Sequence, residues 1–290
     1  MAETSIITIA NQKGGVGKTT TVVNLASAYA QIGKRVLVID LDYQCNASAL
    51  LGVDDNSVGN KSIAYALQND LNFSHIVMKS NMENVDLLAA TRDLDLLREK
   101  FSGQPNQFKL VDILLNCEQL HDYDIVIIDT HPSLDCFFQS AMAASHYYLI
   151  PLFAEADSSK GLAHMVTAVE KIRRYLNPML NLLGCIITCF DKSNATHIKF
   201  EKFIRDASKE GKFNVFETTI PSSKSVAAAS AHSMPLHRYK KSSPVTVAYS
   251  TLAGEILPHL KGKRTGRKPL PVNIDVFNNH NNDYEEQAEL

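Results

Sequence analysis

The amino-acid sequence predicts an α/β fold: a doubly wound, mostly parallel twisted sheet flanked by helices. Two observations carry this prediction. Short, almost wholly apolar runs rich in β-branched residues recur along the chain, and amphipathic segments of helical length lie between them. Strands covered by helices on both faces are apolar throughout, and strand–helix alternation produces parallel strands joined by right-handed crossovers.

Five apolar runs are predicted to be buried parallel strands. In chain order they are SIITIA (5–10), RVLVID (35–40), DIVIID (124–129), YYLIPL (147–152) and LGCIIT (183–188). Residues 52–110 are less regular, and there we expect small helices around one more strand, VDLLAA.

Four segments between these runs are predicted to be helices. KTTTVVNLASAYAQIG ends at Gly33, a residue typical of helix C-caps, and KGLAHMVTAVEKIRRYL is stopped by Asn177 and Pro178. The other two are LDCFFQSAMAAS and ATHIKFEKFIRDASKEG.

Composition limits the class of protein. An apolar content of 45% and a charged content of 21% are typical of soluble globular proteins, and a net charge of −2 means that any nucleic-acid contact must be local. Five cysteines without a C-x-x-C pair favour reduced thiols. No signal peptide and no apolar run of membrane-spanning length is present, so we expect a soluble cytoplasmic protein without a membrane partner.

The chain divides into a globular domain, residues 1–260, and a tail, residues 261–290. The tail begins with basic residues and then becomes Asn-rich and acidic, and its prolines and glycines forbid a continuous helix. Two interpretations stay open. The tail is a flexible, solvated extension, or it is a basic arm that touches nucleic acid through Lys263, Arg264 and Arg267.

The stretch NQKGGVGKTTT, residues 11–21, predicts a nucleotide site. It follows the first strand and precedes the first helix, the context of a phosphate-binding loop, although Gln12 stands where the ordinary pattern has glycine. Backbone N–H groups here can surround phosphate oxygens, Lys18 can neutralise the β- and γ-phosphates, and the Thr19 hydroxyl can ligate Mg²⁺. The cradle residues are Gly14, Gly15, Val16 and Gly17.

Carboxylates at two strand ends complete this predicted site. Asp129 ends DIVIID, and Asp40 and Asp42 end the second strand. The carboxyl ends of parallel strands face the edge where open α/β sheets bind ligands, so we expect the three to converge on the phosphate loop and its metal.

A second lysine, Lys13, lies at the entry of the loop, where one lysine suffices to hold a nucleotide. Its side chain is expected to project past the phosphates that its own backbone surrounds. Two interpretations stay open: Lys13 contacts a phosphate on a facing subunit, as an arginine finger does, or it is an ordinary exposed lysine.

Several motifs, in order, resemble the ParA/MinD ATPases from residue 5 to about 260. KGGVGKTT is similar to their deviant phosphate loop, which places the fold among P-loop NTPases of the deviant Walker A class. VIDLDYQCNAS resembles the family's D-x-D-P-Q-x-N segment, YDIVIIDTHPSL its I-D-x-P-P-S-L segment, and LIPLFAEADSSKGL its P-x-x-x-E stretch. TTIPSSKSVAAASAHSMPL with AYSTLAGEIL resembles the closing part of ParA proper.

The resemblance implies a function and roles for residues. It implies an ATPase with ATP and Mg²⁺ that turns over slowly, forms an ATP-dependent homodimer, binds nonspecific DNA and responds to a ParB-like partner in plasmid or chromosome partition. Such a protein is a bacterial or archaeal cytoplasmic one, on the nucleoid if it binds DNA. Lys13 would act in trans, Thr20 would contact the α-phosphate, and Asp42 would orient the attacking water. The residues at the metal would be Thr19, Asp42 and Asp129. The loop at Pro221 and Ser222 would lie along the adenine.

The sequence departs from the family pattern in two regions. Tyr43 and His131 each replace a proline near the segments that respond to nucleotide. Ser193 and Ser222 stand where relatives often carry DNA-binding arginines. Lysines nearby can supply the phosphate attraction instead, which makes these the candidate DNA contacts: Lys192, Lys224, Lys240 and Lys241.

Three other functions compete with DNA partition. A MinD-like membrane switch needs a C-terminal amphipathic helix, which this tail cannot form. An iron–sulfur reductase needs paired cluster cysteines, and Cys136 has no matching second cysteine. A ParA-like ATPase that positions a protein cargo through an adaptor stays open, because the sequence of the ATPase does not separate it from DNA partition.

Overall fold

The computed structural model describes residues 4–102, 108–115, 117–155, 157–211 and 213–260. Its centre is one seven-stranded sheet in the order β3-β4-β2-β5-β1-β6-β7. The strands are β1 (Ser5–Ile9), β2 (Val36–Leu41), β3 (Met78–Lys79), β4 (Val85–Leu88), β5 (Ile125–Thr130), β6 (Tyr147–Phe153) and β7 (Asn181–Thr188).

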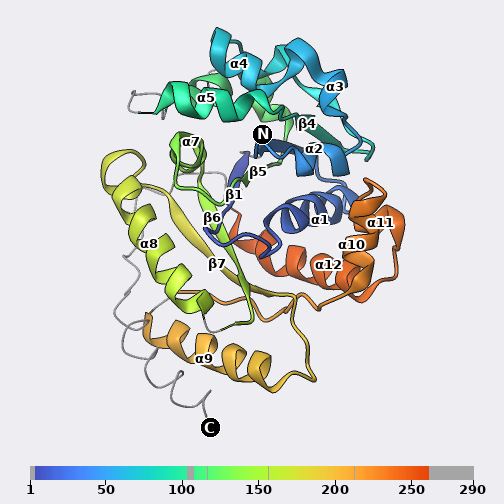
Figure 1. Ribbon diagram of the computed structural model, residues 1–290, viewed down its shortest axis with the longest axis vertical. Helices are drawn as coiled ribbons and strands as arrows, with labels where there is room; N and C mark the ends of the chain where they lie inside the picture. The colour runs from blue at the N-terminus through green and yellow to red at the C-terminus, as the bar shows by residue number, and fades with distance from the viewer. Residues whose placement is uncertain (1–3, 103–107, 116, 156, 212, 261–290) are drawn as a thin grey trace.

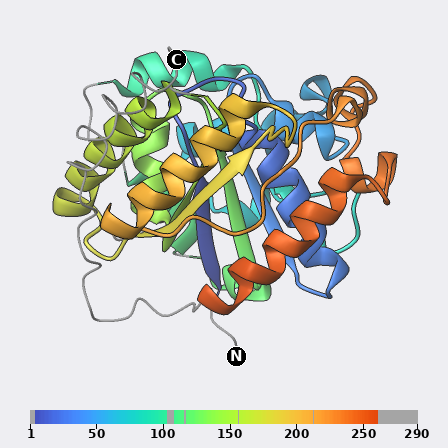
Figure 2. The same ribbon diagram turned by 90° about the horizontal axis from the view of Figure 1, so that it is seen from below.

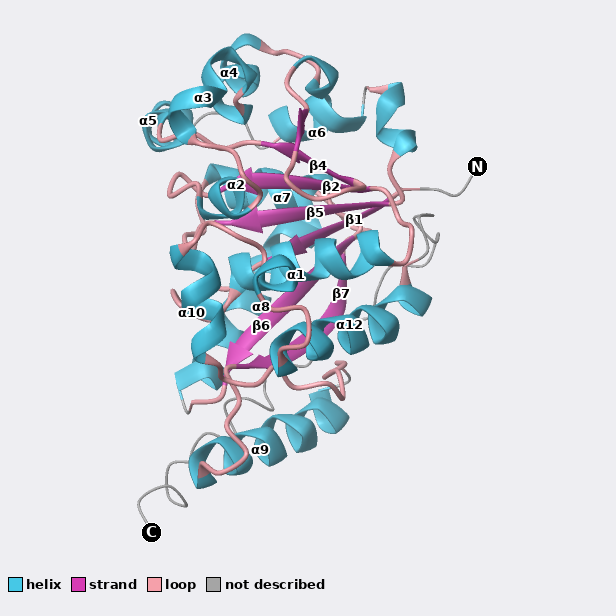
Figure 3. Ribbon diagram, turned by 90° about the vertical axis from the view of Figure 1, so that its right-hand side faces the viewer, coloured by secondary structure: helices cyan, strands magenta, loops and turns pink. Residues whose placement is uncertain are grey.

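All neighbouring strands are parallel except β3, which pairs antiparallel with β4. The arrowheads of the central strands point the same way in Figure 3. The predicted doubly wound, mostly parallel sheet is therefore confirmed. Because β2, β5 and β1 are neighbours, their carboxyl ends meet at one edge, where open α/β sheets bind ligands.

The predicted strands and helices are present, with shifted ends. The four predicted helices are α1 (Lys18–Gln31), α7 (Cys136–Ala144), α8 (Asp157–Tyr175) and α9 (Ala195–Gly211). Helix α7 begins two residues later than the sequence suggested, because the Asp135 side chain accepts hydrogen bonds from Phe137 N and Phe138 N as its N-cap. Strand β3 was not predicted, since two residues are too short to show a period.

The remaining helices are short, except α12 with 13 residues. The α-helices are α2 (Asn46–Leu50), α3 (Asp55–Val58), α4 (Ile63–Asn69), α5 (Asp93–Phe101), α6 (Lys109–Leu115), α10 (Lys224–Ala231), α11 (Leu236–Tyr239) and α12 (Pro244–Ile256). The 3₁₀ turns are η1 (Gly59–Lys61), η2 (Phe73–His75), η3 (Glu118–Asp122) and η4 (Leu257–His259).

Strand side chains alternate between the two faces of the sheet. In β2, Val36 and Val38 join the cluster that contains α1 and α12, whereas Leu37 and Ile39 join the cluster on the opposite face with α4, α5 and α7. Helices α7 and α8 lie on one side of the sheet in Figure 1, and α1 and α12 lie on the other. A strand with both faces covered has no polar face, which explains the continuous apolar runs in the sequence.

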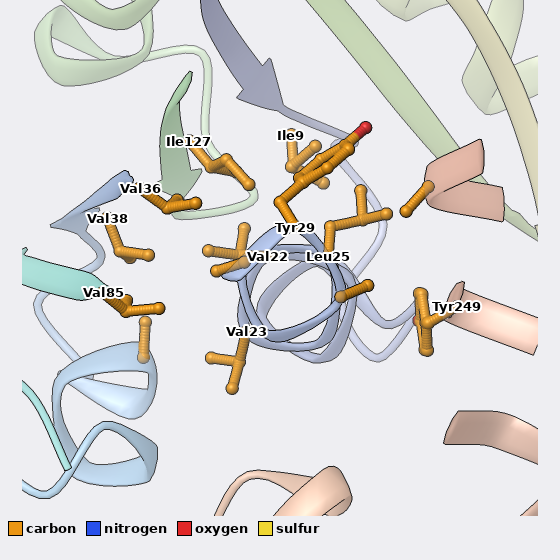
Figure 4. Close-up of a cluster of buried hydrophobic side chains, with 14 of the residues drawn as sticks. Ile9, Val22, Val23, Leu25, Tyr29, Val36, Val38, Val85, Ile127 and Tyr249 are labelled. Atoms are coloured by element: carbon orange, nitrogen blue, oxygen red, sulfur yellow. The ribbon is translucent and has the colours of Figure 1, made fainter. Parts of the chain in front are cut away.

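Helix α1 lies against the sheet and against α12, as Figures 2 and 4 show. Val22, Leu25 and Tyr29 are fully buried in this interface, and an aliphatic side chain such as Val22 or Leu25 contributes roughly 1.5–3 kcal/mol by leaving water. The Thr21 hydroxyl and the Tyr249 hydroxyl of α12 are 3.0 Å apart. This packing fixes the helix whose first turn forms the phosphate site.

The division at residue 260 stays a prediction, because the tail lies outside the described residues. Within the described part of the chain, no helix has the length and apolar character needed to span a bilayer.

Candidate nucleotide-binding site

The loop between β1 and α1 has the backbone shape of a phosphate cradle. Gly15 and Gly17 have φ angles of +74° and +84°, in the left-handed region that favours glycine. Gly17 precedes Lys18, the first residue of α1, so the helix N-terminus opens directly onto the loop. Free N–H groups and the helix dipole at this position favour an anion.

Two buried polar residues hold the loop against the ends of neighbouring strands. Asn11 donates to Pro151 O at 2.7 Å and accepts from Lys13 N at 3.0 Å. The Thr188 hydroxyl, at the end of β7, lies 2.9 Å from Val16 O and 3.0 Å from Leu152 O. Sequence reasoning missed both residues. Asn11 directly follows the first apolar run, which is a weak signal, and nothing in the sequence marks Thr188.

Lys18 is almost completely buried at the centre of the site, with 7% of its surface exposed. Its ammonium donates to Lys13 O at 3.2 Å. Burial lowers the pKa of this ammonium, and the nearby carboxylates of Asp129 and Asp42 oppose that shift. A buried cation at a helix N-terminus, next to a ring of N–H groups, is suited to neutralise a polyphosphate.

The three strand-end carboxylates lie close together, and two of them, Asp129 and Asp42, lie near the Lys18 ammonium. Asp40 and Asp129 are level with each other on adjacent strands, both fully buried, and Asp42 is 5% exposed. Burial first, and then the charge of Asp40, raises the pKa of Asp129 well above its usual range. One oxygen of Asp129 accepts from Thr130 N at 3.1 Å.

The other oxygen, Asp129 Oδ2, is buried and has no hydrogen-bond partner among the described residues. The Thr19 hydroxyl lies beside this carboxyl group and lowers its pKa, but it is not hydrogen-bonded to Oδ2. No group of three His, Cys, Asp or Glu side chains in the described ranges forms a protein-only metal site. The Thr19 hydroxyl and the buried, unpaired oxygen of Asp129 fit Mg²⁺, which takes few protein ligands and keeps phosphates and waters as the rest.

Asp40 has a positioning role instead. Its carboxylate accepts from Ser48 N and Ser48 Oγ, both at 2.8 Å, and from Asp42 N at 3.1 Å. Burial raises its pKa to about 6, and the bonds from Ser48 partly counter this. Ser48 also accepts from Ala90 N at 3.0 Å, so one network connects β2, α2 and the end of β4. The sequence did not single out Ser48.

The Lys13 side chain forms an ion pair within the chain. Its ammonium lies 2.7 Å from Glu155 Oε2 and 5.8 Å from the centre of the Phe153 ring. The two charged side chains are 35% and 50% exposed. Lys13 is thus held at the rim of the site by the segment that follows β6.

A groove beside the loop contains the residues expected along the adenine. It has a volume of about 890 Å³, and Phe190, Pro221 and Ser222 line it. Ser222 N donates to Phe190 O at 2.9 Å, two residues beyond Thr188, which contacts the phosphate loop. The groove therefore lies next to the phosphate cradle, at the same sheet edge.

Two of the predicted DNA residues, Lys192 and Lys224, also line this groove and are exposed. Lys240 and Lys241 are exposed just beyond α11. Ser193, which replaces an arginine of the pattern, donates to Asp191 Oδ1 at 2.7 Å. The tail candidates Lys263, Arg264 and Arg267 lie outside the described residues.

The cysteines bear on the iron–sulfur alternative. All five are free thiols. Cys136, the candidate of the iron–sulfur alternative, donates to Arg98 O at 3.9 Å, and burial raises its pKa to about 11.

Known proteins are similar to this chain in sequence and in fold. A family model described as an AAA domain matches residues 4–182. The chromosome-partitioning ATPase Soj of Thermus thermophilus is 34% identical over 260 residues, which cover 88% of this chain and 96% of that protein.

Two solved structures are also similar. The cobyrinic acid a,c-diamide synthase of Mycobacterium smegmatis, with bound ATP analogue and magnesium, has a TM-score of 0.75 at 28% identity, covering 93% of this chain and 99% of that one. A putative plasmid partition protein of Borrelia burgdorferi bound to AMPPNP has a TM-score of 0.71 at 26% identity, covering 89% and 99%. The chain belongs to the ParA-type partition ATPases.

Proposed function

We propose that this protein binds Mg²⁺-ATP, dimerises around it, binds DNA without sequence preference in the ATP state, and releases DNA after slow hydrolysis stimulated by a ParB-like partner. The proposal rests on one observation: two lysines of the same loop have different environments. Lys18 is buried among carboxylates, whereas Lys13 is held at the rim.

The nucleotide site supports ATP binding and hydrolysis. The N–H groups of residues 14–17 and the Lys18 ammonium would hold the β- and γ-phosphates, and Thr20 would contact the α-phosphate. Thr19 and the unpaired oxygen of Asp129 would hold Mg²⁺, which supplies further neutralisation of the phosphate charge. Asp42, near the metal and the γ-phosphate, would orient the attacking water. The adenine would occupy the groove at Pro221 and Ser222.

Dimerisation would bring Lys13 of one protomer to the phosphates of the other. A cation placed there stabilises the charge that develops on the γ-phosphoryl group during transfer. Its partner in the single chain, Glu155, is half exposed, so the ion pair can be exchanged for the stronger field of a triphosphate.

The DNA contacts would come from exposed lysines around the adenine groove, namely Lys192, Lys224, Lys240 and Lys241. The pKa of His237 is lowered by burial first and then by the charges of Lys241 and Arg238, which indicates a locally positive surface. A dimer doubles this field, so binding through phosphates should require ATP and weaken with salt.

A mobility-shift titration with ATP and with ADP, at two salt concentrations, tests the proposal. Wild type should shift DNA only with ATP, and Lys18→Ala should neither bind ATP nor shift DNA. Replacing both Lys192 and Lys224 by alanine should make DNA binding less dependent on salt. The slope of the logarithm of the binding constant against the logarithm of salt concentration should become shallower by about 0.9 for each DNA phosphate that the variant no longer neutralises. The matched control is Lys61→Ala, an exposed lysine on η1, which should keep the wild-type slope.

The second candidate is a ParA-like ATPase that positions a protein cargo. It is favoured by the serines at 193 and 222, which replace the DNA-binding arginines of the pattern. No DNA shift with ATP at low salt, together with normal ATP binding and dimerisation, would select this candidate over DNA partition.

A further inference from the structure

The two residues that depart from the family pattern next to the active carboxylates contact each other. Tyr43 directly follows Asp42 at the end of β2, and His131 follows Thr130 at the end of β5. Their rings stack, with centroids 4.3 Å apart and planes tilted by 30°. The strands are neighbours, with Leu41 level with Thr130, so the stack joins two segments as they leave the sheet.

Tyr43 lies inside a tight turn that orients Asp42. Asp42 Oδ1 accepts from Gln44 N at 2.9 Å, and Asp42 O accepts from Cys45 N at 2.8 Å. An aspartate that bonds its own backbone two residues later depends on the backbone conformation between them. That intervening residue is Tyr43, so a restraint on the Tyr43 backbone also restrains the Asp42 carboxylate.

On the other side, the stack is connected to the start of α7. His131 Nδ1 is 3.0 Å from Ser133 Oγ, and Ser133 donates to Asp135 Oδ2 at 2.5 Å. Asp135 Oδ1 caps α7 through Phe137 N and Phe138 N. The Arg98 guanidinium of α5 also lies over the Tyr43 ring, 5.9 Å from its centre.

We propose that Tyr43 and His131 act as one unit: a pair of positioning residues that fixes the Asp42 carboxylate relative to the γ-phosphate and connects it to the first turn of α7. The inference rests on the proposed ATPase function. The ParA pattern has proline at both positions, and proline restricts each backbone segment separately. Here an aromatic contact between the segments replaces those two separate restraints.

A double-mutant cycle in single-turnover ATP hydrolysis tests the pair. Tyr43→Ala and His131→Ala should each slow hydrolysis by about two- to tenfold, the range expected for one aromatic contact. The double variant should be no slower than either single variant, because either substitution alone already removes the stack. The dissociation constant of a nonhydrolysable ATP analogue should stay within about twofold, since the phosphate ligands are retained.

His131→Phe separates the two interactions of the histidine. It keeps the stack and removes the bond to Ser133, so hydrolysis near the wild-type rate assigns the effect to the rings. The matched control is Tyr239→Ala, which removes a second His–Tyr ring contact. It joins His232, directly after α10, and Tyr239 at the end of α11, with centroids 5.3 Å apart. That variant should hydrolyse ATP at the wild-type rate.

Single variants with wild-type rates would overturn the inference, and so would a double variant whose slowing is the product of the two singles. If an alanine variant does not fold, Tyr43→Leu and His131→Leu fill the space without a stack and complete the same cycle. A wild-type protein that fails to bind the ATP analogue would instead refute the proposed function, and this inference with it.

Discussion

The ion pair between Lys13 and Glu155 is predicted to oppose formation of the ATP-dependent dimer. Glu155 holds the Lys13 ammonium at 2.7 Å, and the same ammonium is proposed to reach the phosphates of the other protomer. The pair must break before the dimer forms. Glu155→Gln removes the charge that holds Lys13 with almost no change in side-chain volume, so it should favour the ATP-dependent dimer.

The size of the effect follows from exposure. With the two side chains 35% and 50% exposed, the pair is a surface ion pair, for which about 0.2–1 kcal/mol is typical. A dimer breaks two such pairs, so the variant should gain about 0.4–2 kcal/mol per dimer. That free energy corresponds to a dimer dissociation constant lower by about 2- to 30-fold. The difference should shrink at high salt, because surface ion pairs are screened.

Sedimentation equilibrium with a nonhydrolysable ATP analogue measures this constant directly. The control is Asp70→Asn, which removes a comparable ion pair, Lys109 to Asp70 at 2.8 Å, and should leave dimerisation unchanged. Without nucleotide, both variants should remain monomeric. Dimerisation of Glu155→Gln that is unchanged or weaker than in wild type would refute the reasoning that Glu155 holds Lys13 back.

Three further predictions concern the same site. Lys13→Ala should bind the ATP analogue nearly as well as wild type but should not dimerise, as measured by light scattering; normal dimerisation would make Lys13 a simple surface residue. Asp42→Ala should trap an ATP-bound dimer, because the phosphate and metal ligands remain, and wild-type turnover would contradict its role. Asp129→Asn should raise the melting temperature of the nucleotide-free protein at pH 8, and raise it less at pH 5. Burial raises the pKa of Asp129, so the stability of the wild-type protein falls as pH rises towards that pKa. The variant has no carboxyl group at this position and lacks this decrease. An equal rise in melting temperature at both pH values would show that the buried charge of Asp129 is not the cause of the stabilisation.

The elements of the fold were predictable from the sequence because strands buried on both faces form continuous apolar runs that are easy to recognise. Val36 to Ile39 alternate between two apolar clusters, so every position is apolar and the run is conspicuous. Strand β3 forms no such apolar run, because it has only two residues at the edge of the sheet and one of them, Lys79, is exposed. For residues 52–110 the sequence therefore predicts only small helices around one strand.

Some residues of the nucleotide site were predictable from the sequence and others were not. Residues within one motif, such as Gly17, Lys18 and Thr19, were predictable because the loop and its helix are contiguous in the chain. Thr188 and Ser48 were not, because their roles depend on contacts with Val16 and Asp40, which meet them only in the folded sheet. Three-dimensional proximity of this kind has no local signature.

The two lysines of the loop show how one polar side chain separates two functions. Asn11 holds the backbone of Lys13 by accepting from its N–H, and it is itself fixed to Pro151 O on β6. In this conformation the Lys13 carbonyl turns inward and accepts from the Lys18 ammonium, while the Lys13 side chain turns outward to Glu155. The same residue therefore supports the cation that faces its own nucleotide and presents another cation to the outside. A loop with a single lysine can do only the first, and the additional lysine at the entry is what would allow hydrolysis to depend on a second protomer.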